Sequence, residues 1–178
     1  MPQLHPRVPS MSQLHPVPLT QLMRHPLITL RPDHTVVDAL ASAREHGVHH
    51  FPVCDHEQVV GMVCTCDLQE AAQDQVVGNI MRPPVTLRAD RSAADAATLM
   101  KAADVGSVLI MDEHGCPCGI VTRGDLNGEP PLAAILEDCR CEACGSVRHL
   151  QRYRERRLCF SCRERAVEPQ AFETGGGD

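Results

Sequence analysis

Aromatic side chains are nearly absent from this 178-residue chain, which has no tryptophan, one tyrosine and three phenylalanines. Hydrophobic residues still make up 43% of the sequence, so a buried core must be built from aliphatic side chains. No apolar run approaches the roughly 18 residues that a membrane span requires. The proline- and histidine-rich N-terminus also lacks the apolar stretch of a secretory signal. The composition excludes a wholly disordered or collagen-like chain and favours a soluble cytoplasmic protein with no membrane partner.

The ten cysteines are unevenly distributed. Five of them crowd into 24 residues near the C-terminus, and the others stand alone or in C-x-C pairs within apolar runs. A secreted disulfide scaffold would spread its cysteines along the chain. The clustering favours a metal site in a reducing compartment.

Charge divides the chain in a similar way. Residues 1–138 carry nine basic and 17 acidic side chains, whereas residues 139–167 carry eight arginines and three glutamates. The formal net charge of −6 therefore hides a basic C-terminal module on an acidic body.

The body contains an internal repeat with an offset of 57 or 58 residues. Leu22-Met23-Arg24 corresponds to Ile80-Met81-Arg82, and the segment 61–68 corresponds to the segment 119–126. A match of this length is typical of duplication.

Each repeat predicts the order strand, helix, strand, strand, helix. Short apolar runs bounded by proline or charge predict strands, and the pairs Thr35/Asp38 and Ser92/Asp95 predict helix starts. The helices that begin there run to about residues 46 and 103, and second helices start at Asp67 and near residue 125. The predicted strands are 28–30, 48–54 and 59–64 in the first repeat and 85–87, 107–111 and 119–122 in the second.

The predicted organisation has six parts. These are a disordered proline-rich arm at 1–18 (with Met11 as an alternative start), repeats at 19–74 and 75–128, a linker at 129–138 with a short helix at 132–137, a zinc module at 139–167 and a flexible tail at 168–178.

The repeated segments resemble a pair of cystathionine-β-synthase (CBS) domains, the Bateman module. The resemblance covers about residues 19–128 and is carried by the Met-Arg openings, Thr29 and Thr86, the run 51–55 (Phe-Pro-Val-Cys-Asp) and the ending 119–126. It implies an α/β fold of tandem CBS repeats (β-α-β-β-α twice) with pseudo-two-fold symmetry, and a homodimer. It also implies two clefts between the packed sheets for adenine nucleotides or related adenosyl ligands.

Thr122 and Asp125 have side chains that match such a ligand. A ribose diol is best held by one carboxylate that accepts two hydrogen bonds, and a phosphate is held by a hydroxyl and backbone N–H groups at a helix start. Asp125 is predicted to bind ligand rather than cap a helix, because Gly128 and the two prolines at 130 and 131 allow little helix. No nearby group is placed to transfer a proton or attack, so the predicted role is regulatory and not enzymatic.

The first repeat departs from this pattern. Cys64 stands where the family has serine or threonine, and a thiol is a weak phosphate partner, so one working cleft is expected. Asp67 is explained by helix capping. His49 and His50 either reach a phosphate or lie one exposed and one over a strand edge, and Arg123 either reaches a phosphate or lies in a solvated turn. The complete set of predicted nucleotide-binding residues is Thr122, Asp125, Val85, Thr86, Gly106, Ser107, Arg123, His49, His50 and Asp67.

The C-terminal module carries the most specific motif, two C-x-x-C pairs separated by 14 residues: Cys141, Cys144, Cys159 and Cys162. Each pair brings two thiolates within about 4 Å, the edge of a tetrahedron around zinc. Gly145 resembles the knuckle glycine of zinc ribbons, and the segment has too few apolar groups to fold without a metal. Free thiols or a disulfide are the alternative. Cys139 and His149 could substitute as ligands, but the two C-x-x-C pairs already supply four. Zinc held by four thiolates has no open position for a substrate, which also argues against an enzyme.

The arginines between the two cysteine pairs have two interpretations. They either contact nucleic acid phosphates or form a solvated face or a patch against the acidic body. The leading hypothesis is a sensor of AMP, ADP, ATP or S-adenosylmethionine that signals through the zinc module. The alternative is a nucleic-acid-binding or protein-docking zinc protein in which the CBS pair is mainly a dimerisation scaffold.

Overall fold

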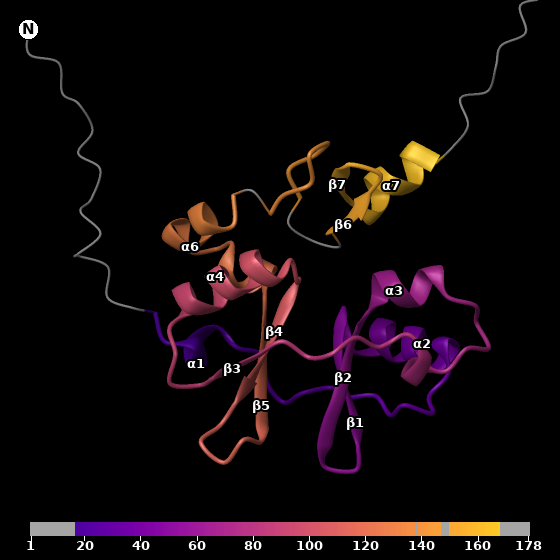
Figure 1. The fold of residues 1–178 in the computed structure, drawn as a ribbon, viewed down its shortest axis with the longest axis horizontal. Coiled ribbons are helices and arrows are strands. Elements are labelled where there is room, and N and C mark those ends of the chain that lie inside the picture. Colours follow the sequence, from indigo (N-terminus) through magenta and orange to yellow (C-terminus); the bar gives the residue numbers. More distant parts are fainter. Residues whose placement is uncertain (1–16, 138, 147–149, 168–178) are drawn as a thin grey trace, which may run out of the picture.

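The computed structural model describes residues 17–137, 139–146 and 150–167. These residues form two α/β halves that stand side by side, with the segment 139–167, here named the cysteine module, across one end of both (Figure 1). Most of the predicted arm, the predicted tail and the substitute ligand His149 lie outside the described residues.

The first repeat contains one antiparallel strand pair and two helices. Its elements are α2 (Val36–His46), β1 (His50–Asp55), β2 (Gln58–Cys64) and α3 (Thr65–Glu70). The capping box that starts α2 is present, with Thr35 and Asp38 each bonded to the other's backbone N–H. The predicted strand at 28–30 is wrong, because only Leu30 makes a bridge, to Val53. Proline flanks the segment at 26 and 32, and proline has no N–H with which to extend the pairing.

The second repeat has the full predicted order. Its elements are β3 (Thr86–Arg88), α4 (Ala93–Ala103), β4 (Ser107–Met111), β5 (Pro117–Thr122) and α5 (Arg123–Leu126). β3 runs parallel to β4, and β4 runs antiparallel to β5. The capping box between Ser92 and Asp95 starts α4 as predicted.

Two predictions at the strand-to-helix turns are wrong. α3 begins at Thr65, so Asp67 is its third residue rather than its cap, and the capping residue Cys64 makes no side-chain capping bond. In the second repeat Thr122 and Asp125 form a capping box on α5. The four residues of α5 therefore suffice for Asp125 to serve as a capping group before the chain reaches Gly128.

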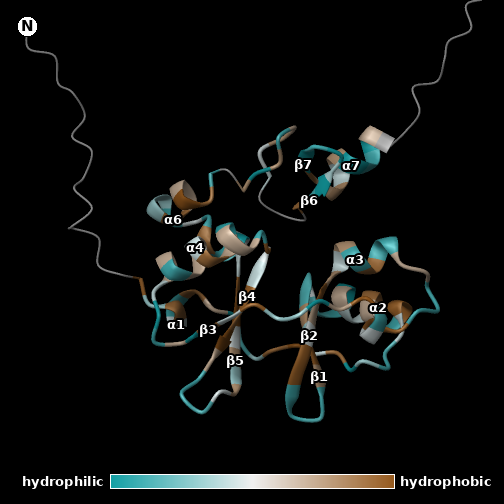
Figure 2. Ribbon diagram, in the orientation of Figure 1, coloured by the Kyte–Doolittle hydropathy of each residue, from teal (hydrophilic) through white to brown (hydrophobic). Residues whose placement is uncertain are grey.

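The segment that leads into each repeat packs against the other repeat. Leu19 of α1 (Leu19–Leu22) lies in the core of the second repeat, and Val77 of η2 (Val77–Asn79) lies in the core of the first. A Cβ at Gly119 or Gly61 would lie 2.6 Å from the Sδ of Met23 or Met81, respectively, so only glycine permits these approaches. The two repeats therefore complete each other's cores. Hydrophobic residues gather on the strands between the halves, whereas the cysteine module is largely hydrophilic (Figure 2).

A short helix joins the body to the cysteine module. α6 (Pro130–Ile135) begins two residues before the predicted 132–137 helix, because its two prolines occupy the first helical turn. Leu132, Leu136 and Cys139 join the core of the second repeat. Cys139 is thus a buried core residue, and its prediction as a substitute metal ligand is wrong.

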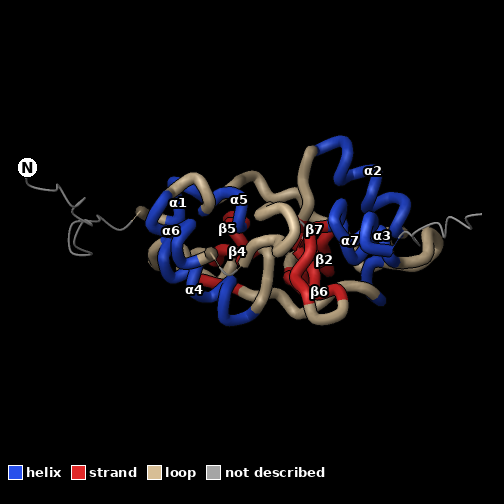
Figure 3. The backbone as a smooth tube through the Cα atoms, turned by 90° about the horizontal axis from the view of Figure 1, so that it is seen from above, coloured by secondary structure: helices blue, strands red, loops and turns tan. Residues whose placement is uncertain are grey.

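The cysteine module contains β6 (Leu150–Tyr153), β7 (Arg156–Cys159) and α7 (Phe160–Val167), with β6 and β7 antiparallel. Viewed from above, the β6–β7 hairpin lies over β2 (Figure 3). Within the described part of the chain, no helix has the length and apolar character to cross a bilayer.

Candidate nucleotide cleft and metal centre

A cavity of about 300 Å³ lies between the two repeats. Small-molecule sites commonly begin at roughly this size. Eight of the ten predicted nucleotide-binding residues line it: His49, His50, Asp67, Val85, Gly106, Ser107, Thr122 and Arg123. The other two do not, since Thr86 is exposed on β3 and Asp125 lies behind Thr122.

The carboxylate of Asp125 is buried at the strand-to-helix turn, where its side chain is 8% exposed. Oδ2 accepts hydrogen bonds from the backbone N–H of Thr122 at 2.9 Å and from its hydroxyl at 2.6 Å. Oδ1 accepts a hydrogen bond from Nε of Arg24 at 2.7 Å. The Arg24 side chain is 64% exposed, so a ligand can displace it with little disturbance of packing.

The first repeat has a related arrangement with weaker groups. Oδ1 of Asp67 accepts from Nη2 of Arg82 at 2.7 Å, and Oδ2 accepts from the thiol of Cys64 at 3.1 Å. Hydrogen bonding with Cys66, burial and nearby charge all raise the pKa of Cys64, which is therefore a neutral donor. A thiol is a weaker donor than the hydroxyl of Thr122. Each half of the cleft thus has an aspartate carboxylate paired with an arginine, but the third partner is a hydroxyl at Asp125 and a thiol at Asp67.

Sequence reasoning missed the two arginines that hold these carboxylates. Arg24 leads into the first repeat but pairs with Asp125 of the second, and Arg82 leads into the second but pairs with Asp67 of the first. The sequence did mark the two arginines, because both belong to the repeated Met-Arg dipeptide. Their partners could not be read from it, because they lie on the other repeat.

Arg123 is buried, with 4% of its side chain exposed, which excludes the solvated turn, one of its two predicted alternatives. Its Nε and Nη2 atoms are buried and make no hydrogen bond, although Nη2 lies 3.5 Å from Oδ1 of Asp104. Burial lowers the pKa of the guanidinium. Buried donors without a hydrogen bond are costly; Nη2 has the ion pair with Asp104 but no hydrogen bond, and both atoms belong to a residue that lines the cavity.

The two histidines differ in exposure, since His49 is exposed and His50 is half-buried. A Cβ at Gly106 would lie 2.9 Å from Nε2 of His50. His50 therefore reaches across the cleft from the first repeat to the second. Both rings line the cavity, and both take part in further interactions.

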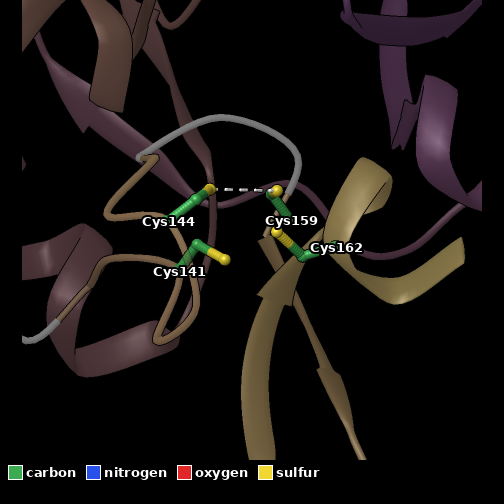
Figure 4. A group of neighbouring side chains, drawn as sticks. All are labelled: Cys141, Cys144, Cys159 and Cys162. Atoms are coloured by element: carbon green, nitrogen blue, oxygen red, sulfur yellow. Dashed lines mark hydrogen bonds between the residues drawn. The ribbon is translucent and has the colours of Figure 1, made fainter. Parts of the chain in front are cut away.

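The four cysteines of the C-x-x-C pairs converge on one point. Their sulfur atoms all lie within 4.8 Å of one another, and those of Cys144 and Cys159 are 3.6 Å apart. Two come from the loop before β6 and two from the end of β7 and the start of α7 (Figure 4). Zinc–sulfur bonds of about 2.3 Å require sulfur separations of about 3.8 Å. The donor set and its geometry fit a tetrahedral zinc ion.

The backbone around these sulfurs is arranged as a knuckle. Gly145 has a φ of +73°, and its N–H donates to the carbonyl of Cys141 at 2.8 Å. Burial raises the pKa of Cys141, but hydrogen bonds from backbone N–H groups and from Cys144 outweigh this and bring it to about 6. Burial and hydrogen bonding with the other thiols raise the pKa of Cys159 to about 12. One thiolate thus disfavours the next, a repulsion that a bound cation relieves.

The arginines of the cysteine module partly face the acidic body. Nη2 of Arg157 lies 2.9 Å from Oδ1 of Asp104, and Arg163 forms an ion pair with Glu70. Arg154 stacks over Tyr153 and is exposed. This pairing agrees with the interpretation of the cluster as a patch against the body.

The comparisons with known proteins agree with this architecture. The family model for the CBS domain matches residues 19–74 and 77–129. The chain is 32% identical over 124 residues to a CBS domain-containing protein of Dictyostelium discoideum, a match that covers 60% of this chain and 86% of the relative. It is 28% identical over 132 residues to an uncharacterized protein of Methanopyrus kandleri, covering 68% of this chain and 67% of the relative.

Two solved structures are informative. CBSX2 in complex with AMP is 27% identical, with a TM-score of 0.55 over 66% of this chain and 98% of that one. The CBS domain pair of protein MJ0100, solved with 5′-methylthioadenosine and S-adenosylmethionine, has a TM-score of 0.60 at 22% identity, over 64% of this chain and 95% of that one, and shares the fold. Because the family model matches more than half of the sequence in two copies, the chain belongs to the CBS-domain family.

Proposed function

We propose that this chain is a regulatory sensor of an adenine nucleotide or adenosyl compound, of the class of AMP, ADP, ATP or S-adenosylmethionine. The observation that carries the proposal is the cavity between the repeats, because Thr122 and Arg24 both line it and both donate hydrogen bonds to the carboxylate of Asp125. The complex of the similar CBSX2 with AMP supports the same ligand class.

The ribose diol is assigned to Asp125. A diol that donates two hydrogen bonds to the carboxylate replaces the bond from Arg24. Because Arg24 is mostly exposed, it remains free to turn toward a ligand phosphate. The capping bonds to Thr122 hold the carboxylate in place during this exchange.

The anionic part of the ligand is assigned to Arg123, with His49 and His50 on the facing wall. Two buried guanidinium N–H groups without hydrogen bonds suit a phosphate or carboxylate oxygen. Val85, Gly106 and Ser107 are among the other second-repeat residues that line the cavity. Thr86 is exposed on β3 and does not line the cavity, so the proposal assigns it no contact.

The four cysteines are proposed to hold zinc as a structural ion. Bound there, zinc supplies a cross-link between the loop before β6 and the start of α7, and four thiolates leave it no open position for a substrate. The output proposed for the sensor is a change in how the cysteine module meets a protein partner. A homodimer and a cytoplasmic location remain part of the proposal.

The test is a titration of the purified chain with AMP, ADP, ATP and S-adenosylmethionine, followed by thermal unfolding and calorimetry. A ligand present at a hundred times its Kd stabilises the fold by about 2.7 kcal/mol, which raises the Tm by about 5 °C or more for a chain of this size. Asp125→Asn is expected to abolish most of the shift, and Asp90→Asn, an exposed carboxylate paired with Arg88, is the control. No shift with any of the four compounds refutes the sensor.

The nucleic-acid alternative keeps one supporting observation, the exposure of Arg152 and Arg154 beside Tyr153. A gel shift that weakens steeply with salt and disappears in the double variant Arg154→Ala/Arg156→Ala would favour it. The sensor proposal predicts no such shift at physiological salt.

A further inference from the structure

The cavity has a third wall that neither CBS repeat provides. Leu150 and Gln151 of β6 lie in its lining, although both belong to the cysteine module, beyond the segment that the CBS family model matches. Figures 1 and 3 show the hairpin of β6 and β7 over the end of β2, on the side where the two halves meet. The cysteine module therefore forms part of the site that the repeats enclose.

Gln151 presents an unused hydrogen-bonding group to this site. Its Nε2 makes a long contact of 3.5 Å with Oδ1 of Asp67. Its Oε1 is buried and accepts no hydrogen bond. A buried acceptor without a partner costs free energy, and a hydroxyl or amino group of a ligand in the cavity would satisfy it.

The module is attached to both repeats. Arg157 pairs with Asp104 of the second repeat at 2.9 Å, and Arg163 pairs with Glu70 of the first. The same oxygen of Asp104 lies 3.5 Å from Nη2 of Arg123. A chain of charged groups thus runs from the cavity through Arg123, Asp104 and Arg157 to β7, two residues before a metal-binding cysteine.

The internal packing of the module is too small to fix β6 alone. Its buried hydrophobic cluster consists of three of the four cysteines and Leu158, with Leu150 and Tyr153 packed against it. A metal bound to the four sulfurs would add a cross-link that holds β6 on the cavity, beside the ion pairs to the two repeats.

We propose that zinc loading of the cysteine module sets the affinity of the cleft for its adenosyl ligand, and that Gln151 contacts the ligand through its free Oε1. This inference rests on the proposed function. Because coupling between two binding sites is reciprocal, the ligand must tighten zinc binding by the same factor.

The experiment uses the full chain and whichever of AMP, ADP, ATP and S-adenosylmethionine binds tightest in the titration. Calorimetry compares the zinc-loaded chain, the chelator-stripped chain and Gln151→Ala. Loss of the contact is expected to weaken binding about tenfold in both altered forms, as for one lost hydrogen bond in a buried site. Arg152→Ala, an exposed residue of the same strand, is the matched control and is expected to bind like the parent.

Three further measurements distinguish this coupling from the effect of a variant that merely misfolds. The tetrahedral spectrum of Co²⁺ bound to the module reports whether Gln151→Ala still assembles the four thiolates. Arg157→Ala keeps all four thiols and the cavity lining but removes the contact with Asp104, so it is expected to weaken ligand binding as well. Competition with a chelator measures zinc affinity with and without ligand, and a tenfold effect on the ligand requires a tenfold effect on zinc.

The outcomes separate the two proposals. Equal ligand affinity in the loaded, stripped and Gln151→Ala forms overturns this inference and leaves the sensor standing. Tighter binding after stripping also overturns it, since the module would then obstruct the cleft. Failure of every form to bind any of the four compounds overturns the proposed function and this inference together.

Discussion

The two CBS repeats share the order helix, strand, strand, helix, although the second has an additional first strand, and they differ at the turn that faces the cleft. In the second repeat a threonine hydroxyl and the carboxylate of Asp125 form a complete capping box. In the first repeat the thiol of Cys64 takes the hydroxyl's place, and no side-chain capping bond forms. Each carboxylate nevertheless receives an arginine from the chain leading into the opposite repeat. Duplication has thus preserved the cross-repeat packing while the groups proposed to hold the ligand have diverged.

The largest expected effect tests the dependence of one repeat on the other. Phe51 is fully buried in the core of the first repeat, and Phe51→Ala is expected to destabilise the fold by about 3–5 kcal/mol. Because the leading segments exchange cores, we expect one urea transition that includes the strands of the second repeat. The exposed Val60 supplies the control, Val60→Ala, which should change stability by less than about 0.5 kcal/mol. Two separate transitions would show that the repeats unfold independently.

Ligand binding is expected to separate the two carboxylates. Asp125→Asn should weaken binding about 10- to 100-fold, the loss of hydrogen bonds to a charged group, when measured by calorimetry with the tightest of the four candidate compounds. Asp67→Asn should weaken it less, because its half of the cleft lacks the threonine. Equal losses of affinity in the two variants would mean that Asp125 and Asp67 hold the ligand in the same way.

Arg24, which pairs with Asp125, is expected to affect AMP and adenosine differently. Arg24→Ala should weaken binding of AMP about tenfold, as for one charge-assisted hydrogen bond, and should leave adenosine binding unchanged or improved. The reason is that Arg24 competes for the ribose site but assists the phosphate. An equal loss for AMP and adenosine would exclude this exchange.

Restoring the missing hydroxyl should make the repeats more alike. Cys64→Thr is expected to stabilise the fold by about 0.5–2 kcal/mol by completing the cap of α3, and Thr122→Cys should destabilise it by a similar amount. Urea unfolding of both variants measures the difference. A neutral Cys64→Thr would show that the backbone at this turn cannot form the box.

The smallest expected change in stability is the pH dependence of the capping boxes that start α2 and α4. Hydrogen bonds within each box lower the pKa of Asp38 and Asp95 from their ordinary value of 3.8. A lowered pKa in the folded state contributes stability that is present above 3.8 and is lost as the pH falls through the lowered value. The stability difference between the parent and Asp38→Asn or Asp95→Asn should therefore shrink in acid, by similar amounts in the two repeats. A difference that grows in acid would contradict this sign.

Local patterns in the sequence predicted much of this fold. The capping pairs located α2 and α4, the hydrophobic runs located five strands (β1 to β5), and the spacing of the C-x-x-C pairs identified the four converging sulfurs. The missed features depend on contacts between distant segments. The residues next to Arg24 and Arg82 in the sequence do not indicate that each pairs with an aspartate of the other repeat. Likewise, the residues around Gln151 do not indicate that it lines the cavity.

The same limit explains the errors at the turns. The prolines after Asp125 made helix capping the less favoured prediction, yet a helix of four residues is long enough for the capping box to form. The sequence left Arg123 either on a ligand phosphate or in a solvated turn, and its burial excludes the solvated turn. Both outcomes follow from tertiary packing rather than from sequence neighbours.

A crystal structure of the zinc-loaded chain with its tightest adenosyl ligand tests the central claim most directly. The account predicts ribose hydroxyls on the carboxylate of Asp125, Arg24 turned away from it, and an anionic group within hydrogen-bonding distance of Arg123. A ligand bound outside the cavity, with the pair between Arg24 and Asp125 intact, would contradict it.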